Sequence, residues 1–151
     1  MRVTLYEYAG GGEALLRLAR AHHVRCLADP ELNHPFSHEG QHPQHVERLA
    51  LYWGEVLGGP RDYSQSCGTQ TDLLKLHSGN GDLSDLNRRF VDCFVAAADD
   101  AGLPDDVEFR AALRAYMEWA VDAFNAHPAD ARGVPPGLSV PRWEWEGLGA
   151  T

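Results

Sequence analysis

Residues 71–81 read Thr71-Asp-Leu-Leu-Lys-Leu-His77-Ser-Gly-Asn-Gly81, an apolar segment that ends in one histidine and runs directly into a glycine-rich loop. The leucines predict a short helical turn, which Thr71 or Asp72 can cap, and the glycines keep this turn short. A lone histidine in such a turn is most often a buried core residue. Histidine is also the commonest metal ligand, because its neutral imidazole offers a nitrogen lone pair. His77 is therefore a candidate ligand if the rest of the chain places a binding site opposite it.

The composition predicts one compact, acidic domain. The chain has 151 residues, of which 44% are hydrophobic, and this is enough for one core. Its net charge of -9 argues against binding to nucleic acid or to an anionic membrane, because phosphate groups are bound by clustered lysine and arginine. We find no apolar run long enough to cross a membrane, no signal-peptide pattern and no metal-ligand spacing among the cysteines, which favours a reduced, cytoplasmic protein. The eight histidines are the one unusual feature of the composition.

Apolar residues at helical spacing predict four main helices, near residues 13–28, 43–57, 84–101 and 105–127. Pro43 is placed as the first residue of the second helix and Ser84 as the cap of the third. The fourth begins at two aspartates and is expected to end at His127-Pro128. His22 and His23 lie near the buried face of the first helix, and His45 lies on the mainly apolar face of the second.

The remaining segments are rich in helix breakers. Residues 33–43 form an irregular corner around Phe36, which either fills the core or lines a site, and residues 61–69 form a polar connector that contains Tyr63. We expect one domain over residues 1–128. Residues 129–151 form an extension that either docks on this domain through its two tryptophans or is disordered. No segment shows the alternation expected of a strand.

Several short motifs occur in an order and at a spacing typical of one family. They are Gly10-Gly11, Ala28-Asp29-Pro30-Glu-Leu32, Pro35-Phe36, Glu47-Arg48-Leu49, Trp53, Gly58-Gly-Pro60, Tyr63-Ser64 and His77. From about Leu5 to Phe124 the chain resembles the group II truncated haemoglobins. The chain also resembles the actinobacterial branch of this family at His38, His42-Pro-Gln-His45 and Pro141-Arg-Trp143.

This resemblance implies an all-α, shortened globin fold, a two-over-two helical sandwich with a reduced proximal helix. It also implies a haem b cofactor whose iron is bound by His77 as the axial ligand. The porphyrin requires an apolar slot, and the side chains that match it are Phe36, Leu49, Leu73, Leu76, Phe90 and Phe94. The propionates require cations or hydroxyls, and Arg48, Tyr63 and Lys75 match in type and position.

On the open side of the iron, the resemblance places Phe36, His45, Leu49 and Phe90, with His23 opposite them. Three positions depart from the family pattern. His22-His23 replace a phenylalanine-tyrosine pair, Phe90 replaces a tryptophan, and Leu76 replaces the basic residue that precedes the proximal histidine. The usual tyrosine and indole hydrogen bonds to the ligand are therefore missing, and oxygen affinity cannot be transferred from the family.

The implied function is reversible binding of O2 and of other diatomic ligands, CO and NO, by a monomer or homodimer. Two oxidative side activities are compatible with it, peroxidase and nitric oxide dioxygenase, with His23 and His45 as candidate catalytic residues that donate hydrogen bonds or protons to oxygen or peroxide. Dioxygenation requires a separate reductase, because no flavin or nicotinamide fingerprint is present.

Three alternatives remain open at this point. If His23 or His45 coordinates the iron, the protein is a bis-histidyl redox or electron-transfer protein. A non-haem metal site is conceivable at His34, His38, His42 and His45, although Pro35, Gly40 and Pro43 argue against a continuous helix there. The last alternative is a colourless helical interaction domain without a cofactor.

Overall fold

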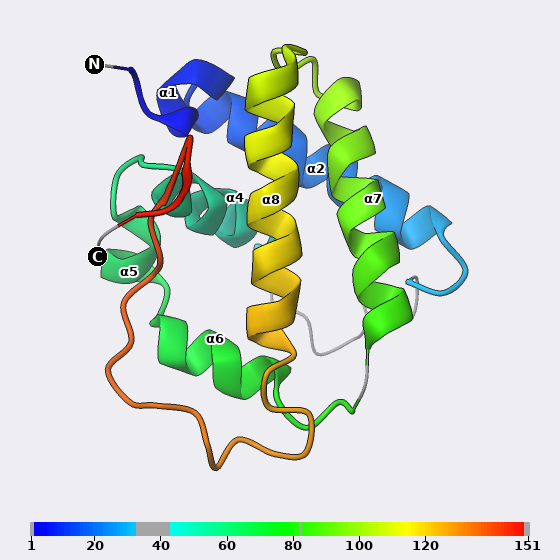
Figure 1. Cartoon of the computed structure of the whole chain (residues 1–151), viewed down its shortest axis with the longest axis vertical. Helices are drawn as coiled ribbons and strands as arrows, with labels where there is room; N and C mark the ends of the chain where they lie inside the picture. Colours follow the sequence, from blue (N-terminus) through cyan, green and yellow to red (C-terminus); the bar gives the residue numbers. More distant parts are fainter. Residues whose placement is uncertain (1, 33–42, 82, 150–151) are drawn as a thin grey trace.

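Two pairs of helices form the body of the molecule in the computed structural model, which describes residues 2–32, 43–81 and 83–149. Helix α2 (Gly12–Ala28) packs against α4 (His45–Val56) and against α7 (Ser84–Asp100), and α7 packs against α8 (Val107–Phe124). In Figure 1, α7 and α8 run side by side and cross over α2 and α4. The predicted all-α architecture, with two helices over two, is confirmed.

The four helices meet through one apolar core. Helix α2 buries residues three or four positions apart, which lie on one helical face: Ala14, Leu15, Leu18, Ala19, His22 and Cys26. The Trp53 ring of α4 packs edge-on against the Phe94 ring of α7, with centroids 4.9 Å apart. Arg25 and Asp100 form a bidentate ion pair between the outer faces of α2 and α7, with one N–H···O distance of 2.9 Å.

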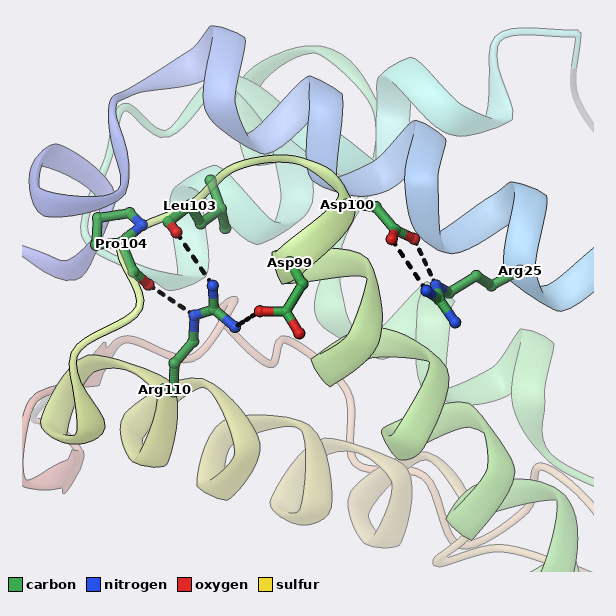
Figure 2. A network of polar contacts seen from close by, with 6 residues as sticks. All are labelled: Arg25, Asp99, Asp100, Leu103, Pro104 and Arg110. Carbon is green, nitrogen blue, oxygen red and sulfur yellow. Dashed lines mark hydrogen bonds and ion pairs between the residues drawn. The ribbon is translucent and has the colours of Figure 1, made fainter.

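The connection between α7 and α8 is fixed by one arginine. Arg110, in the first turn of α8, donates to the carbonyl oxygens of Leu103 and Pro104 at 3.1 and 2.6 Å, and it pairs with Asp99 at 2.6 Å (Figure 2). The Asp106 carboxylate caps α8 by accepting from the backbone N–H of residue 109. The Asp106 bond satisfies a backbone N–H that the start of α8 leaves unpaired, and the Arg110 bonds pair two carbonyl groups of the loop.

Two short helices lie where none was predicted. Helix α1 (Leu5–Ala9) begins at Thr4, whose hydroxyl accepts from the Glu7 N–H, and ends at Gly10 with a φ of 116°. Helix α5 (Asp62–Ser66) lies within the segment predicted as a polar connector. Each is five residues long. The prediction failed because little more than one turn gives no apolar period to detect.

Helix α6 (Gln70–His77) ends at the predicted residue but begins earlier than predicted. The cap is Thr69, whose hydroxyl accepts from the Asp72 N–H at 3.1 Å, so the prediction of Thr71 or Asp72 as the cap is wrong. The glycine loop that follows His77 keeps α6 short, as expected.

Other predicted boundaries differ by a few residues. Helix α4 begins two residues after Pro43, α7 has Leu83 at its N-cap and Ser84 as its first residue, and α8 ends at Phe124, before His127. Such differences are ordinary, because helix ends depend on local capping rather than on the apolar face.

The C-terminal residues form a small hairpin, so the expectation of no strand is wrong. Strands β1 (Trp143–Glu144) and β2 (Gly147–Leu148) pair antiparallel, and each is too short to show alternation in sequence. Trp143 is only 7% exposed, and Trp145 donates its indole N–H to the Val3 carbonyl at 2.9 Å. The boundary at residue 128 between two units stays a prediction. Within the parts of the chain that the structure describes, no helix is long and apolar enough to span a membrane.

Candidate functional site

His77 is the last residue of α6, and its ring is oriented by the helix that carries it. Its Nδ1 lies 2.7 Å from the carbonyl oxygen of Leu73, one turn earlier. A carbonyl only accepts hydrogen bonds, so this contact assigns the proton of the neutral imidazole to Nδ1. The Nε2 atom then carries the lone pair, which is the arrangement that a metal ligand requires.

The surroundings of His77 favour its neutral form. Its ring packs against the Phe124 ring of α8, with centroids 4.6 Å apart. The residue is exposed, yet neighbouring protein atoms partly desolvate its ring. This desolvation lowers the pKa of His77, and the hydrogen bond to Leu73 offsets only part of the effect. The imidazole is therefore neutral near pH 7.

His45, the first residue of α4, presents a buried nitrogen to the same region. Its Nε2 has no hydrogen-bond partner among the residues that the structure describes. The His45 and His23 rings lie 6.1 Å apart. Burial lowers the pKa of His45, and electrostatic repulsion from the nearby side chains of His23, His77 and Arg48 contributes to the same shift. A buried, unpartnered ring nitrogen is costly unless something outside the chain satisfies it.

His22 points into the core, whereas its neighbour His23 is only half-buried. The His22 Nε2 lies 3.3 Å from the carbonyl oxygen of Phe90 and 3.4 Å from the Cys26 sulfur. Its ring meets the Phe90 ring edge-on, with centroids 4.4 Å apart. Burial lowers the pKa of His22 to about 4, so it is a neutral link between α2 and α7.

The predicted apolar lining is divided between the site and the core. Leu49, Leu73 and Phe90 are half-buried, as expected of side chains beside an opening. Phe94 is 0% exposed and belongs to the core, against Trp53. Leu76 is 75% exposed, an unusual position for an apolar side chain next to a candidate ligand. Phe36 lies outside the residues that the structure describes.

Two of the three predicted propionate contacts lie together. Arg48 donates from Nη2 to the carbonyl oxygen of Cys67 at 3.1 Å. Tyr63 is 6% exposed and packs edge-on against Tyr52 at 5.2 Å. Burial raises the pKa of Tyr63, and the Arg48 guanidinium partly offsets the rise. Lys75 is exposed on α6.

Two contact residues were missed in the sequence. Phe124 was recognised only as part of the apolar face of its helix, and Thr71 only as a cap. Nothing in the spacing of either residue indicates the contact with α6 or with the C-terminal residues, because both contacts join segments far apart in the chain.

The described parts of the surface offer no competing cluster of metal ligands. No cluster of three or more histidine, cysteine or acidic side chains that could hold a metal occurs among the described residues. His34, His38 and His42 of the alternative non-haem site lie outside them. A groove of about 900 Å³ between the end of α2 and the start of α7 contains none of the predicted site residues, and its lining is dominated by charged side chains.

Comparison with known proteins agrees with this arrangement. Residues 4–127 match the family described as bacterial-like globin. A thermostable hemoglobin from the actinobacterium Thermobifida fusca is 33% identical, with a TM-score of 0.66, over 81% of this chain and 96% of that one. A hemoglobin from Chloroflexus aurantiacus is 26% identical, with a TM-score of 0.66, over 82% of this chain and 98% of that one.

The group II truncated hemoglobin from Bacillus anthracis is 17% identical, with a TM-score of 0.68, over 82% of this chain and 92% of that one, a likeness that shows the fold. No match was found among curated protein sequences. The resemblance inferred from the sequence is therefore confirmed. The chain belongs to the bacterial-like globin family and is a haem-binding globin with the truncated-haemoglobin fold.

Proposed function

We propose that this globin binds O2, CO and NO reversibly at a haem b that His77 holds as the axial ligand. The observation that carries the proposal is the buried, unpartnered Nε2 of His45 in the same neighbourhood as His77. The residues fit a haem in three respects. They provide a neutral imidazole with a lone pair on Nε2, half-buried apolar side chains, and a half-buried imidazole, His45, whose buried Nε2 needs a partner.

Haem, when bound, supplies an iron with one coordination position open to a diatomic ligand. His77 holds it from α6, and the Nδ1–H bond to Leu73 keeps the ring from turning and increases the basicity of Nε2. Phe124 of α8 packs against the ring. Leu49 and Phe90 restrict access of water to the ligand side, which strengthens polar interactions there.

His45 and His23 are proposed to form the polar part of the ligand side. Both rings are within reach of one small ligand, because their centroids lie 6.1 Å apart. The lowered pKa of His45 keeps it neutral near pH 7, so it offers one N–H without a full positive charge. An N–H from His45 or His23 stabilises partial negative charge on a bound ligand. This replaces the hydrogen bonds that the family's tyrosine and tryptophan make.

Arg48 and Tyr63 are the proposed contacts of the haem propionates. Arg48 is the stronger candidate, because a guanidinium can pair with a carboxylate through two hydrogen bonds. Its bond to the Cys67 carbonyl uses one of its five N–H donors. Lys75 lies on an exposed helix face and is proposed only as a peripheral contact.

The unpartnered Nε2 of His45 also supports a second function. If the Nε2 of His45 carries the lone pair rather than the proton, His45 can coordinate the iron opposite His77. The protein is then a bis-histidyl redox protein, and a diatomic ligand binds only after His45 dissociates. Peroxidase or nitric oxide dioxygenase activity is compatible with the first function, with a reductase as partner in the latter case.

Absorption spectra of the purified full-length protein test the proposal. We expect an intense Soret band that shifts when CO is added to the dithionite-reduced protein. A five-coordinate ferrous spectrum before CO supports the oxygen-binding function, and a six-coordinate, low-spin ferrous spectrum supports the bis-histidyl function. A colourless protein that also fails to bind added haem contradicts both.

A further inference from the structure

The helix that carries His77 is poorly supported by the other helices. Helix α6 is eight residues long, and only Gln70, Thr71 and Leu74 are buried. Its main helical neighbour is α8. In Figure 1 the C-terminal segment that follows α8 runs past α6 on its way to the hairpin. Further support comes from Tyr52 of α4, which donates to the Gln70 side-chain oxygen at 2.8 Å, and from this segment.

Thr71 joins the middle of the C-terminal segment to α6. Its hydroxyl donates to the carbonyl oxygen of Pro135 at 2.8 Å and accepts from the backbone N–H of Leu138 at 2.9 Å. The side chain is 7% exposed, so both bonds are shielded from water. One hydroxyl thus uses its single donor and one of its acceptor sites on the same partner segment.

The loop after His77 is joined to the start of the same segment. The backbone N–H groups of Gly79 and Gly81 donate to the carbonyl oxygens of His127 and Pro128, each at 2.9 Å. Both glycines have positive φ, 76° and 72°, a conformation that other residues rarely adopt. The C-terminal segment therefore contacts α6 near its beginning and also just beyond its end.

The far end of the segment is fixed to the helical body. Arg142 donates from Nη1 to the carbonyl oxygens of Glu55 and Gly59, at 2.6 and 2.8 Å. Trp143 packs against Tyr116 and Trp119 of α8, with centroids 5.8 and 5.6 Å away. A segment held at both ends restrains whatever is bonded to its middle.

We propose that residues 127–143 act as a strap that holds α6 in place, and that Thr71 is a positioning residue which sets the orientation of His77 toward the iron. The inference rests on the proposed function, because it requires His77 to be the axial ligand. The link between the two residues is rigid. The His77 ring is bonded to the Leu73 carbonyl of its own helix, so a tilt of α6 turns the ring with it.

The test compares Thr71→Val with Thr71→Ser in the full-length haem-bound protein. Valine has nearly the shape of threonine but no hydroxyl, and serine keeps the hydroxyl. The first readout is the iron–histidine stretching band of the ferrous protein in resonance Raman spectra, which reports the orientation of the axial imidazole. The second readout is the rate of haem transfer to an excess of an acceptor apoglobin.

We expect Thr71→Val to broaden or shift the iron–histidine band and to accelerate haem loss about fivefold, the change that corresponds to one net hydrogen bond. Thr71→Ser should resemble the parent protein. Arg142→Ala, which releases the far end of the strap without touching α6, should act in the same direction and carries the test if Thr71→Val does not fold.

Two kinds of failure are distinguishable. A parent protein that binds no haem, or that keeps its iron–histidine band in His77→Gly, overturns the proposed function and the axial role of His77. A parent protein with a band that depends on His77, but with no change in Thr71→Val or Arg142→Ala, overturns the strap alone. Equal changes in Thr71→Val and Thr71→Ser also overturn it, because the hydroxyl bonds are then not responsible.

Discussion

The two walls of the site are built in different ways. His23, His45 and Phe90 lie on α2, α4 and α7, which pack against one another and share the core. His77 lies at the end of α6, most of which is outside that core and is held by hydrogen bonds to the C-terminal segment and to Tyr52 of α4. We call the side formed by α2, α4 and α7 the packed wall and the side formed by α6 the held wall. We infer that substitutions in the packed wall affect folding and ligand binding together, whereas substitutions in the held wall affect haem retention with less effect on folding.

The largest expected effect comes from removing a core side chain of the packed wall. Phe94→Ala removes a ring that is 0% exposed, and we expect a loss of about 3–5 kcal/mol in the free energy of unfolding, measured by chemical denaturation. The matched variant on the other wall is Phe124→Ala, which removes a half-buried ring packed on His77. It should cost less stability and accelerate haem loss. The reverse order of stabilities contradicts the distinction between the walls.

The next effect is a dependence of stability on pH through His22. Its pKa is lowered from 6.5 to about 4 in the folded protein, so between these values the unfolded chain binds one more proton than the folded chain. Stability is complete above about pH 6.5 and falls by roughly 3 kcal/mol as the pH decreases to about 4. Denaturation curves at several pH values measure this loss.

The control for this titration is the adjacent residue. His22→Phe should remove most of the acid-induced loss, because phenylalanine cannot be protonated, whereas His23→Phe should retain it. A loss that persists unchanged in His22→Phe assigns the pH dependence to other groups.

A smaller effect is expected on ligand release. His45→Leu and His23→Phe each remove an N–H from the proposed ligand side, and the O2 dissociation rate should change by about tenfold, equivalent to one hydrogen bond of roughly 1.4 kcal/mol. Stopped-flow release of O2 into dithionite measures it. If His45 instead coordinates the iron, His45→Leu accelerates CO binding and makes the ferrous protein five-coordinate. If neither variant changes either rate, the ligand side is arranged differently.

The smallest effect is expected at the proposed contacts of the haem propionates. Arg48→Gln should accelerate haem loss about twofold to threefold at low ionic strength, because a partly exposed ion pair contributes less than about 1 kcal/mol. The difference should shrink in 1 M salt, where charges are screened over about 3 Å. Lys75→Gln, on an exposed helix face, is the matched control and should have less effect. An equal effect of the two variants removes the special role of Arg48.

The packed wall was largely predictable from the sequence, and the held wall was not. Long helices repeat their apolar positions, so α2, α4, α7 and α8 could be found with only their ends misplaced. Helices α1 and α5 and the hairpin are too short to show a repeat of apolar positions. The bonds of Thr71 to residues 135–138 depend on how two distant segments fold back together, which no local pattern contains.

The residue types of the site were predictable, but the directions in which their side chains point were less so. His77 could be found because a glycine loop stops its helix. His22 shares the helical spacing of Leu18 and Cys26, so its burial follows from the pattern, whereas nothing in the pattern predicts what the adjacent His23, about 100° away around the helix, lies against. The structure buries His22 against Phe90 and leaves His23 half-buried, 6.1 Å from His45. The register of α2 against α7 decides this.

The most direct test of the central claim is the absorption spectrum of His77→Gly, reconstituted with haem, before and after addition of imidazole. We predict weak or absent haem binding without imidazole, and recovery of a parent-like ferrous spectrum when imidazole occupies the space that the side chain leaves. Full, tight haem occupancy with an unchanged ferrous spectrum in the absence of imidazole would contradict the assignment of His77 as the axial ligand.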